Sequence, residues 1–156
     1  MARTTPATLA LQKAAVAFTL HAYAYDPDAP RIGLHAAESL GVDPARVLKT
    51  LMAEVDGKPV CVVLASDREV AMKRLAAAVG GKSAQMMKPA DAERITGYHV
   101  GGVSPFGQKR RAPTVLDVAA MAHDRVFVNA GQRGLQAELA PADLAAALGA
   151  VLAEIS

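Results

Sequence analysis

From Val47 to Ala65 the chain reads Val-Leu-Lys-Thr-Leu-Met-Ala-Glu-Val-Asp-Gly-Lys-Pro-Val-Cys-Val-Val-Leu-Ala. Two apolar runs flank the Asp56-Gly57 pair, and such a pair between two strand-like runs is the strongest short-range signal of a β-hairpin. We therefore predict two antiparallel strands, over 47–55 and 59–65, joined by a tight turn.

Helices and strands alternate on both sides of this hairpin. Apolar residues at helical spacing, with proline in the first turn or glycine after the last, predict helices over 6–16, 34–40, 72–79, 89–95 and from Pro141 onward. Shorter runs predict strands over 18–25, 84–87, 114–116, 125–128 and 135–139. Because this order lacks a regular βαβ rhythm, we predict an α/β or α+β fold with a mixed sheet. A length of 156 residues favours one domain over 1–156.

The end of the chain carries an apolar stripe at helical spacing. It consists of Leu144, Leu148, Val151, Leu152 and Ile155. We interpret the stripe as the buried face of the last helix, with a dimer face as the alternative.

Composition excludes several classes of protein. Hydrophobic residues make up 52% and charged residues 21%, which is typical of a folded globular protein. The net charge of +2 is too small for a dedicated nucleic-acid binder, so any such contact needs a local basic patch. A single cysteine, Cys61, excludes an internal disulfide and suits the cytoplasm. The apolar runs are too short to cross a bilayer, so we expect a cytoplasmic protein with no membrane partner.

The sequence gives no sign of a metal or another cofactor. The histidines are scattered, without the spacing of metal ligands. Cys61 lies in the run Val60-Cys-Val-Val63, where a buried and inert thiol is expected.

A glycine-rich loop begins at Gly97 and reads Gly-Tyr-His-Val-Gly-Gly-Val-Ser-Pro-Phe-Gly-Gln-Lys-Arg-Arg-Ala-Pro. Glycines allow a backbone to approach a ligand closely, and Pro105 restricts the residue before it. The cations Lys109, Arg110 and Arg111 then place charge where a phosphate chain can lie. The alternative is a surface turn followed by a solvated basic face.

Within that loop, Gly102-Val103-Ser104-Pro105 resembles the nucleophile elbow of hydrolases. The elbow requires a second glycine where this chain has Phe106, and it uses a backbone N–H that Pro105 lacks. Ser104 is therefore a poor candidate nucleophile, although it can still form hydrogen bonds.

Lys49 stands between apolar residues of the first predicted hairpin strand. A lysine at such a position either protects an exposed strand edge or faces a cleft as a functional cation. The local sequence leaves both interpretations open.

These motifs together resemble the YbaK/EbsC family of free-standing aminoacyl-tRNA deacylases, which is similar to the editing insertion of bacterial prolyl-tRNA synthetases. The resemblance covers nearly the whole chain and is closest to the branch that acts on Cys-tRNA(Pro). It is carried by the stretches 18–26, Arg46-Val-Leu-Lys-Thr-Leu51, 96–111 and Gly131-Gln-Arg-Gly-Leu-Gln-Ala-Glu-Leu139.

The resemblance implies a fold and a set of site residues. The fold is a mixed, barrel-like sheet surrounded by helices. The family's critical lysine falls on Lys49. Substrate-binding positions fall on Tyr23, Ile32, Gly33, Thr50, Gly101, Gly102, Val103, Ser104, Pro105, Asn129 and Gln136. Asn129 stands where a serine is familiar, and Gln136 where an aspartate is familiar, so the chain lacks a pocket carboxylate.

The resemblance also implies an activity. The expected substrate is mischarged Cys-tRNA(Pro), whose own thiol attacks the ester while Lys49 and the glycine loop position it. The alternatives are a deacylase that uses water on Ala-tRNA(Pro) or another small mischarged residue, and a non-catalytic module that binds tRNA or a synthetase. The implied partners are tRNA, contacted by Lys109, Arg110 and Arg111, and prolyl-tRNA synthetase in a transient complex.

Overall fold

The computed structural model describes residues 4–29 and 31–156, and only the backbone of Ile32. The helices are α1 (Pro6–Lys13), α2 (Ile32–Leu40), α3 (Met72–Ala78), α4 (Pro89–Thr96) and α5 (Pro141–Leu148). The strands are β1 (Thr19–Ala22), β2 (Leu48–Val55), β3 (Lys58–Ala65), β4 (Ala84–Met86), β5 (Thr114–Asp117), β6 (Val126–Asn129), β7 (Leu135–Leu139) and β8 (Val151–Ala153). The predicted α/β fold with mixed strand directions is therefore confirmed.

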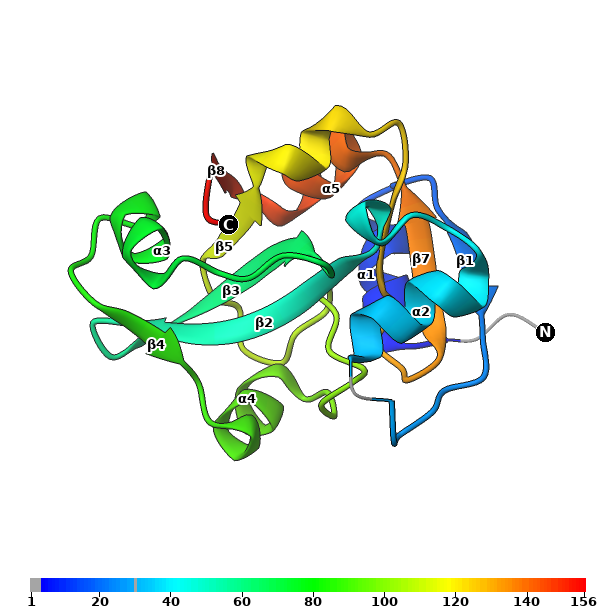
Figure 1. The fold of residues 1–156 in the computed structure, drawn as a ribbon, viewed down its shortest axis with the longest axis horizontal. Coiled ribbons are helices and arrows are strands. Elements are labelled where there is room, and N and C mark those ends of the chain that lie inside the picture. Colours follow the sequence, from blue (N-terminus) through cyan, green and yellow to red (C-terminus); the bar gives the residue numbers. More distant parts are fainter. Residues whose placement is uncertain (1–3, 30) are drawn as a thin grey trace.

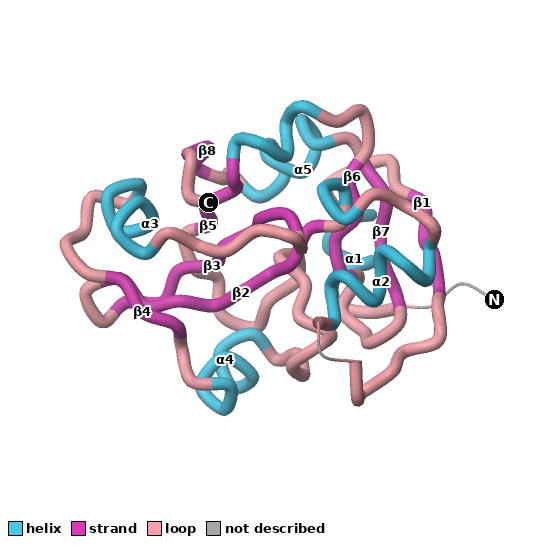
Figure 2. Tube along the Cα trace, in the orientation of Figure 1, coloured by secondary structure: helices cyan, strands magenta, loops and turns pink. Residues whose placement is uncertain are grey.

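The strands form two sheets, which Figures 1 and 2 show side by side. One has the order β4-β2-β3-β5-β8, with antiparallel and parallel neighbours, and the other has the order β1-β7-β6. An isolated bridge between Val47 and Phe127 connects them. Within 4–29 and 31–156 the sheets do not close into a barrel, so the expected barrel-like form is realised as two sheets that meet at one seam.

Helices α1 and α2 cover opposite faces of the three-stranded sheet. On one face, Leu11 of α1 packs in the same cluster as Val126 and Val128 of β6. On the other, Ala37 of α2 packs with Phe127, the residue between those two valines. The alternation of side chains along β6 therefore supplies both faces of a small sandwich.

The predicted hairpin is confirmed. Asp56 and Gly57 have φ values of 50° and 81°, as a tight hairpin turn requires, and Val55 pairs directly with Lys58. The paired strands continue from there to Leu48, opposite Ala65. The hairpin thus runs from an exposed turn at one end to the seam between the sheets at the other.

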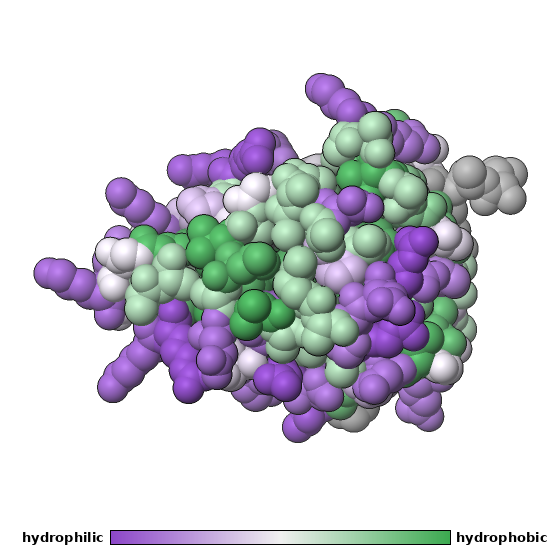
Figure 3. All heavy atoms as spheres, turned by 90° about the horizontal axis from the view of Figure 1, so that it is seen from above, coloured by the Kyte–Doolittle hydropathy of each residue, from purple (hydrophilic) through white to green (hydrophobic). Residues whose placement is uncertain are grey.

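The predicted C-terminal stripe is wrong at Val151 and Leu152, which are exposed, whereas Ile155 is buried as predicted but lies beyond the helix. Helix α5 ends at Leu148 because Gly149 adopts a left-handed conformation with φ of 60°. The chain then forms β8, a parallel neighbour of β5, and exposes Val151 by 43% and Leu152 by 45%. Figure 3, viewed from the side of β8 and α5, shows apolar atoms gathered on this face. The spacing of apolar residues alone does not show that a helix ends at a glycine and that a strand follows it.

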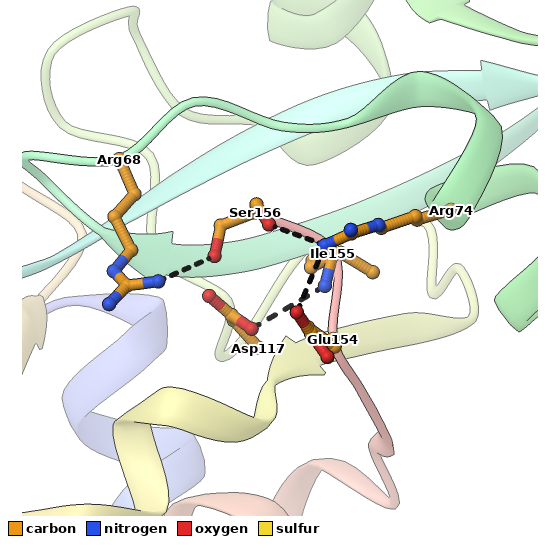
Figure 4. Close-up of polar contacts among 6 residues, drawn as sticks. All are labelled: Arg68, Arg74, Asp117, Glu154, Ile155 and Ser156. Carbon is orange, nitrogen blue, oxygen red and sulfur yellow. Dashed lines mark hydrogen bonds and ion pairs between the residues drawn. The ribbon is translucent and has the colours of Figure 1, made fainter.

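Polar contacts fix the chain after β8 (Figure 4). The N–H of Ile155 donates to the buried carboxylate of Asp117 at 3.5 Å. Arg74 donates to Glu154 and to the main-chain oxygen of Ser156, at 3.0 and 2.9 Å. The short edge strand is therefore held by its tail as well as by β5.

None of the helices within the described residues is long and apolar enough to span a membrane.

Candidate functional site

A cavity of about 330 Å³ opens where the two sheets meet. The start of β2, the ends of β6 and β7 that face the seam, the first turn of α2 and the glycine-rich loop all contribute to it. Its lining consists of Ala29, Arg31, Gly33, Val47, Leu48, Lys49, Thr50, Leu51, Ser66, Glu69, Gly101, Val103, Asn129 and Gln136. The fold thus brings together seven of the predicted site residues from five distant segments.

Lys49 lies on β2 opposite Leu64 of β3 and lines this cavity, half-buried. In the described part of the chain no carboxylate lies within ion-pair distance of its ammonium group. The geometry therefore favours a cation that faces a cleft over an edge-protecting lysine. A cation without a counter-ion in a small cavity is suited to an anionic or electron-rich ligand.

Two lining residues, Thr50 and Gln136, carry buried polar atoms without a hydrogen-bond partner, and so does Tyr23, which neighbours Gln136 but does not itself line the cavity. Among the described residues four such atoms occur, and three belong to predicted site residues: Tyr23 Oη, Thr50 Oγ1 and Gln136 Oε1. Burial raises the pKa of Tyr23, and the neighbouring Gln136 amide partly opposes the shift. Unpaired buried polar groups are costly and are expected where a ligand completes the bonding. The fourth atom, Asp117 Oδ2, lies beside the C-terminal tail.

Gly33 closes the cavity at the first turn of α2. A Cβ atom at this position would lie 2.6 Å from the Cβ of Ser66, which real structures do not tolerate. Ser66 in turn donates its hydroxyl to the carbonyl of Pro44 at 3.0 Å. The glycine therefore allows α2 to approach the end of β3. The predicted side chain of Ile32 lies outside the described part.

The glycine-rich loop packs against the β6–β7 turn through residues without side chains. Gly101 has φ of 92°, and a Cβ there would lie 2.7 Å from Tyr25 Oη. A Cβ on Gly102 would lie 2.9 Å from the nitrogen of Arg133. Both glycines are thus required by close approach, and Gly101 by its backbone conformation as well.

Asn129 joins the glycine-rich loop to the β6–β7 turn. Its Nδ2 donates to the carbonyls of Gly101 at 3.4 Å and Gln132 at 3.1 Å. Its Oδ1 accepts the N–H groups of Gly131 at 2.7 Å and Gln132 at 3.2 Å. The amide is occupied by the protein itself, so its contribution to the site is to hold the loops rather than to contact a ligand with a free polar group.

The second half of the predicted substrate loop faces away from the cavity. The hydroxyl of Ser104 is fully buried and accepts the N–H of Phe106 at 3.2 Å. Gln108 donates to the carbonyl of Ser104 at 3.0 Å. Pro105 lines a different recess, behind the loop. Of the five predicted loop residues, Gly101 and Val103 line the cavity, whereas Gly102, Ser104 and Pro105 support it.

The cavity offers no activated nucleophile among the described residues. Its hydroxyl groups belong to Thr50 and Ser66, and neither histidine nor cysteine lines it. Cys61 is buried, as predicted, and burial raises its pKa to about 12, so its thiol stays neutral. An attacking group must therefore come from solvent or from the ligand.

The cations Lys109–Arg111 follow the loop in sequence but do not line the cavity. Arg110 and Arg111 line a second recess, of about 510 Å³, beside Asp56 and Lys58 at the hairpin turn. That turn lies six residues along β2 from Lys49, which corresponds to about 20 Å. Two of the three predicted phosphate contacts, Arg110 and Arg111, are thus at the opposite end of the hairpin from the cavity.

Several lining residues carry no signal in the sequence. Arg31 and Glu69 place opposite charges at the cavity, and Ser66 follows directly on β3. No local pattern marks them, because each comes from a connecting segment whose position depends on the packing of α2 against the hairpin.

A family model described as "Aminoacyl-tRNA editing domain" matches residues 27–147. The chain is 41% identical over 122 residues to EbsC of Enterococcus faecalis, provisionally named a Cys-tRNA(Pro)/Cys-tRNA(Cys) deacylase, which covers 77% of this chain and 74% of that protein. It is 38% identical over 72 residues to the proline–tRNA ligase of Maridesulfovibrio salexigens, which covers 46% of this chain and 12% of the ligase. A solved structure described as a provisional trans-editing enzyme for prolyl tRNA synthetase has a TM-score of 0.82 at 20% identity, over 99% of both chains, and shows the likeness of fold.

Proposed function

We propose that this chain, which belongs to the family of aminoacyl-tRNA editing domains, is a free-standing deacylase that cleaves the aminoacyl ester of mischarged Cys-tRNA(Pro). The similarity to EbsC, whose name specifies Cys-tRNA(Pro) and Cys-tRNA(Cys), supports this substrate. The similarity to a short segment of proline–tRNA ligase supports a link to proline decoding.

One observation carries the proposal. The cavity combines a cation without an ion-pair partner, Lys49, with two residues that carry buried unpaired polar atoms, Thr50 and Gln136, and among the described residues it contains no activated nucleophile. Such a site is suited to bind and polarise a group that is already reactive. An aminoacyl ester is such a group, because positioning and stabilisation of the developing oxyanion are sufficient for its cleavage.

In the proposed reaction the attacking atom belongs to the substrate. The cysteinyl sulfur forms a bond to its own ester carbonyl carbon, and the bond from that carbon to the ribose oxygen breaks. The thiol proton ends on the ribose oxygen, so the products are a cyclic thiolactone and tRNA. A thiol is nucleophilic even when only partly ionised, whereas a serine hydroxyl is not. This chemistry would favour cysteine over serine of similar size.

The chain's own residues have separate tasks in this scheme. Lys49 stabilises the charge that develops on the ester oxygen or holds the terminal phosphate. The N–H of Gly102 is engaged with the carbonyl of His99 at 2.8 Å, so we assign the donor role in the loop to the N–H of Val103. We assign Gln136 Oε1, which is buried and unpaired, as the acceptor for the substrate's α-ammonium group.

The size of the cavity supports a small amino acid. A volume of about 330 Å³ is at the lower end of the range for ligand pockets, and it must hold the aminoacyl group together with part of the ribose. The buried unpaired oxygens of Thr50 and Gln136 also disfavour a large apolar side chain, which would leave them unpaired.

We propose that the rest of the tRNA docks at the far end of the hairpin. Arg110, Arg111 and Lys58 line one recess there, about 20 Å from Lys49. In the described part of the chain none of these cations has an ion-pair partner. Phosphates of the RNA backbone are the matching partner. A transient complex with prolyl-tRNA synthetase would supply the selection of tRNA(Pro).

A side-by-side assay of Cys-, Ala- and Ser-tRNA(Pro) tests the proposal. We expect Cys-tRNA(Pro) to lose its amino acid fastest, with Ser-tRNA(Pro) nearly untouched. Faster cleavage of Ala-tRNA(Pro) would instead support attack by water, because alanine has no thiol. Binding of all three without cleavage would indicate a non-catalytic tRNA-binding module.

A further inference from the structure

The N-cap residue of α1 makes one contact that capping does not need. Thr5 accepts the N–H of Thr8 at 3.0 Å, and Thr8 accepts the N–H of Thr5 at 2.8 Å, which completes a capping box. The hydroxyl of Thr5 also donates to the carbonyl of Ala130 at 2.5 Å, across 125 residues of sequence. Thr5 is 7% exposed, so this bond is protected from water.

Ala130 lies between two residues that organise the cavity. Asn129 before it lines the cavity and holds Gly101, and Gly131 after it donates to Asn129 Oδ1. A hydrogen bond to the carbonyl of Ala130 therefore acts on the peptide at the centre of this arrangement.

The first turn of α1 also touches the far limb of the glycine-rich loop. A Cβ on Gly107 would overlap the carbonyl of Pro6, and a Cβ on Gly131 would lie 3.2 Å from both Ala7 Cβ and Thr5 Oγ1. Within the glycine-rich loop, the hydroxyl of Tyr98 donates to the carbonyl of Phe106 at 2.6 Å and so connects the two limbs of the loop. The first turn of α1 thus lies against both glycine-bearing segments, with no room for a side chain on either.

We infer that Thr5 is a positioning residue for the deacylation site: its hydroxyl fixes Ala130, and through Asn129 the placement of Gly101 beside Lys49. The inference rests on the proposed function for its effect on turnover. Residues 5–13 lie outside the stretch 27–147 that matches the family model, so this role is not part of that match. The ester must be held within a fraction of an ångström of its reactive geometry, which is why a support outside the cavity affects the rate.

Three variants test this role against the pairing of Thr5 with Thr8 in the capping box. Thr5→Val keeps the shape but removes both the cap and the bond to Ala130. Thr5→Ser keeps both. Thr8→Val is the matched control for the box, because it removes the acceptor of the Thr5 N–H and leaves both the Thr5 cap and the Thr5 donor to Ala130 in place. Each variant is measured for kcat and KM on Cys-tRNA(Pro), for thermal stability, and for amide exchange at Gly131 and Gln132, whose N–H groups Asn129 accepts.

We expect Thr5→Val to lower kcat by about tenfold with KM nearly unchanged, and to accelerate exchange at Gly131 and Gln132. Thr5→Ser should restore both values, whereas Thr8→Val should lower stability without either effect. Equal losses of kcat and equal exchange in Thr5→Val and Thr8→Val would overturn the inference, as would a Thr5→Val protein indistinguishable from the wild type.

The exchange measurement needs no substrate. If the wild type cleaved none of the three aminoacyl-tRNAs, the proposed function would fail, while exchange in Thr5→Val against Thr8→Val would still decide whether Thr5 holds the loop. Unchanged exchange in Thr5→Val would then contradict the inference on its own.

Discussion

The two ends of the β2–β3 hairpin both carry cations but differ in the polar groups that surround them. At the seam end, Lys49 and Thr50 line a cavity in which the side-chain oxygens of Thr50 and Gln136 are buried and unpaired. At the turn end, Lys58, Arg110 and Arg111 surround an open recess at the surface. Both ends carry cations and a closely packed glycine, Gly81 at the turn end, but only the seam end has lining residues with buried unpaired polar atoms among the described residues. One hairpin thus connects a cavity suited to precise positioning of a ligand with a surface suited to long-range electrostatic attraction.

This comparison indicates that the surroundings of a basic residue decide its role. A charge at the surface interacts through water, so its contribution is spread over many geometries and falls with salt. A charge in a small cavity acts at a fixed distance and through less water, so it can favour a transition state. Substitutions at matched positions of the two ends should therefore change different kinetic constants.

The largest effect is expected from Lys49→Ala. Removal of the cation should lower kcat by about 10²–10³-fold with the fold intact, because one electrostatic stabiliser is lost. Single-turnover deacylation of Cys-tRNA(Pro) and a thermal melt measure the two properties. Lys58→Ala, at the other end of the same hairpin, is the control and should leave kcat unchanged. Wild-type turnover by folded Lys49→Ala would remove Lys49 from the reaction.

Gly101→Ala should have the next largest effect. The added methyl would lie 2.7 Å from Tyr25 Oη, so the loop must move and turnover should fall by about tenfold or more. Gly57→Ala is the control, since it has a comparable φ of 81° at the hairpin turn and open space around it. It should lower stability by about 1 kcal/mol without loss of turnover. Equal turnover in both variants would indicate that the glycine-rich loop is an ordinary turn without a role in the reaction.

Neutralisation of Lys109, Arg110 and Arg111 should raise KM and leave kcat at saturating tRNA nearly unchanged. Fewer counter-ions are released, so the slope of log affinity against log salt should flatten by about 2 to 3. A salt titration of tRNA binding measures the slope for the wild type and the triple variant. Identical slopes would indicate that these residues are solvated and do not contact tRNA, so the docking face would remain unassigned.

The smallest effect on turnover is expected from Cys61→Ser, because this thiol is buried away from the cavity. Its pKa of about 12 exceeds the ordinary value of 9.0, so the folded state holds its proton more tightly than the unfolded state. The corresponding stability is fully present below pH 9.0 and is lost as pH rises toward 12. At pH 10.5 the wild type should have lost about 2 kcal/mol more than the variant, relative to pH 7. Urea unfolding at both pH values measures the difference, and loss of turnover in folded Cys61→Ser would reveal a missed catalytic thiol.

Local signals sufficed for much of the fold. Asp56-Gly57 fixed the hairpin, because its turn depends on residues adjacent in sequence. Glycines after helices predicted their ends correctly at Gly41 and Gly97, where both adopt left-handed conformations. The end of α5 at Gly149 is not predicted, because the apolar stripe continues past this glycine into the residues that form β8.

The site was less accessible to sequence reasoning. Lys49 and Gly101 were assigned through the family resemblance, and the fold places both at one cavity, although their roles remain predictions. The occupied amide of Asn129 and the bond from Thr5 to Ala130 join residues far apart in sequence, so no local pattern carries them. The position of Lys109–Arg111 could not be predicted either, because these residues follow the loop in sequence but do not line the cavity.

The central claim is that the cavity positions an ester which the substrate's own thiol opens. Wild-type single-turnover rates on Cys-tRNA(Pro) and on the same tRNA charged with 2-aminobutyrate, in which a methyl replaces the thiol, test it most directly. We expect the 2-aminobutyryl ester to be cleaved at least about 10²-fold more slowly, because an intramolecular nucleophile has been lost. Equal rates for the two esters would contradict the account and assign the attack to water.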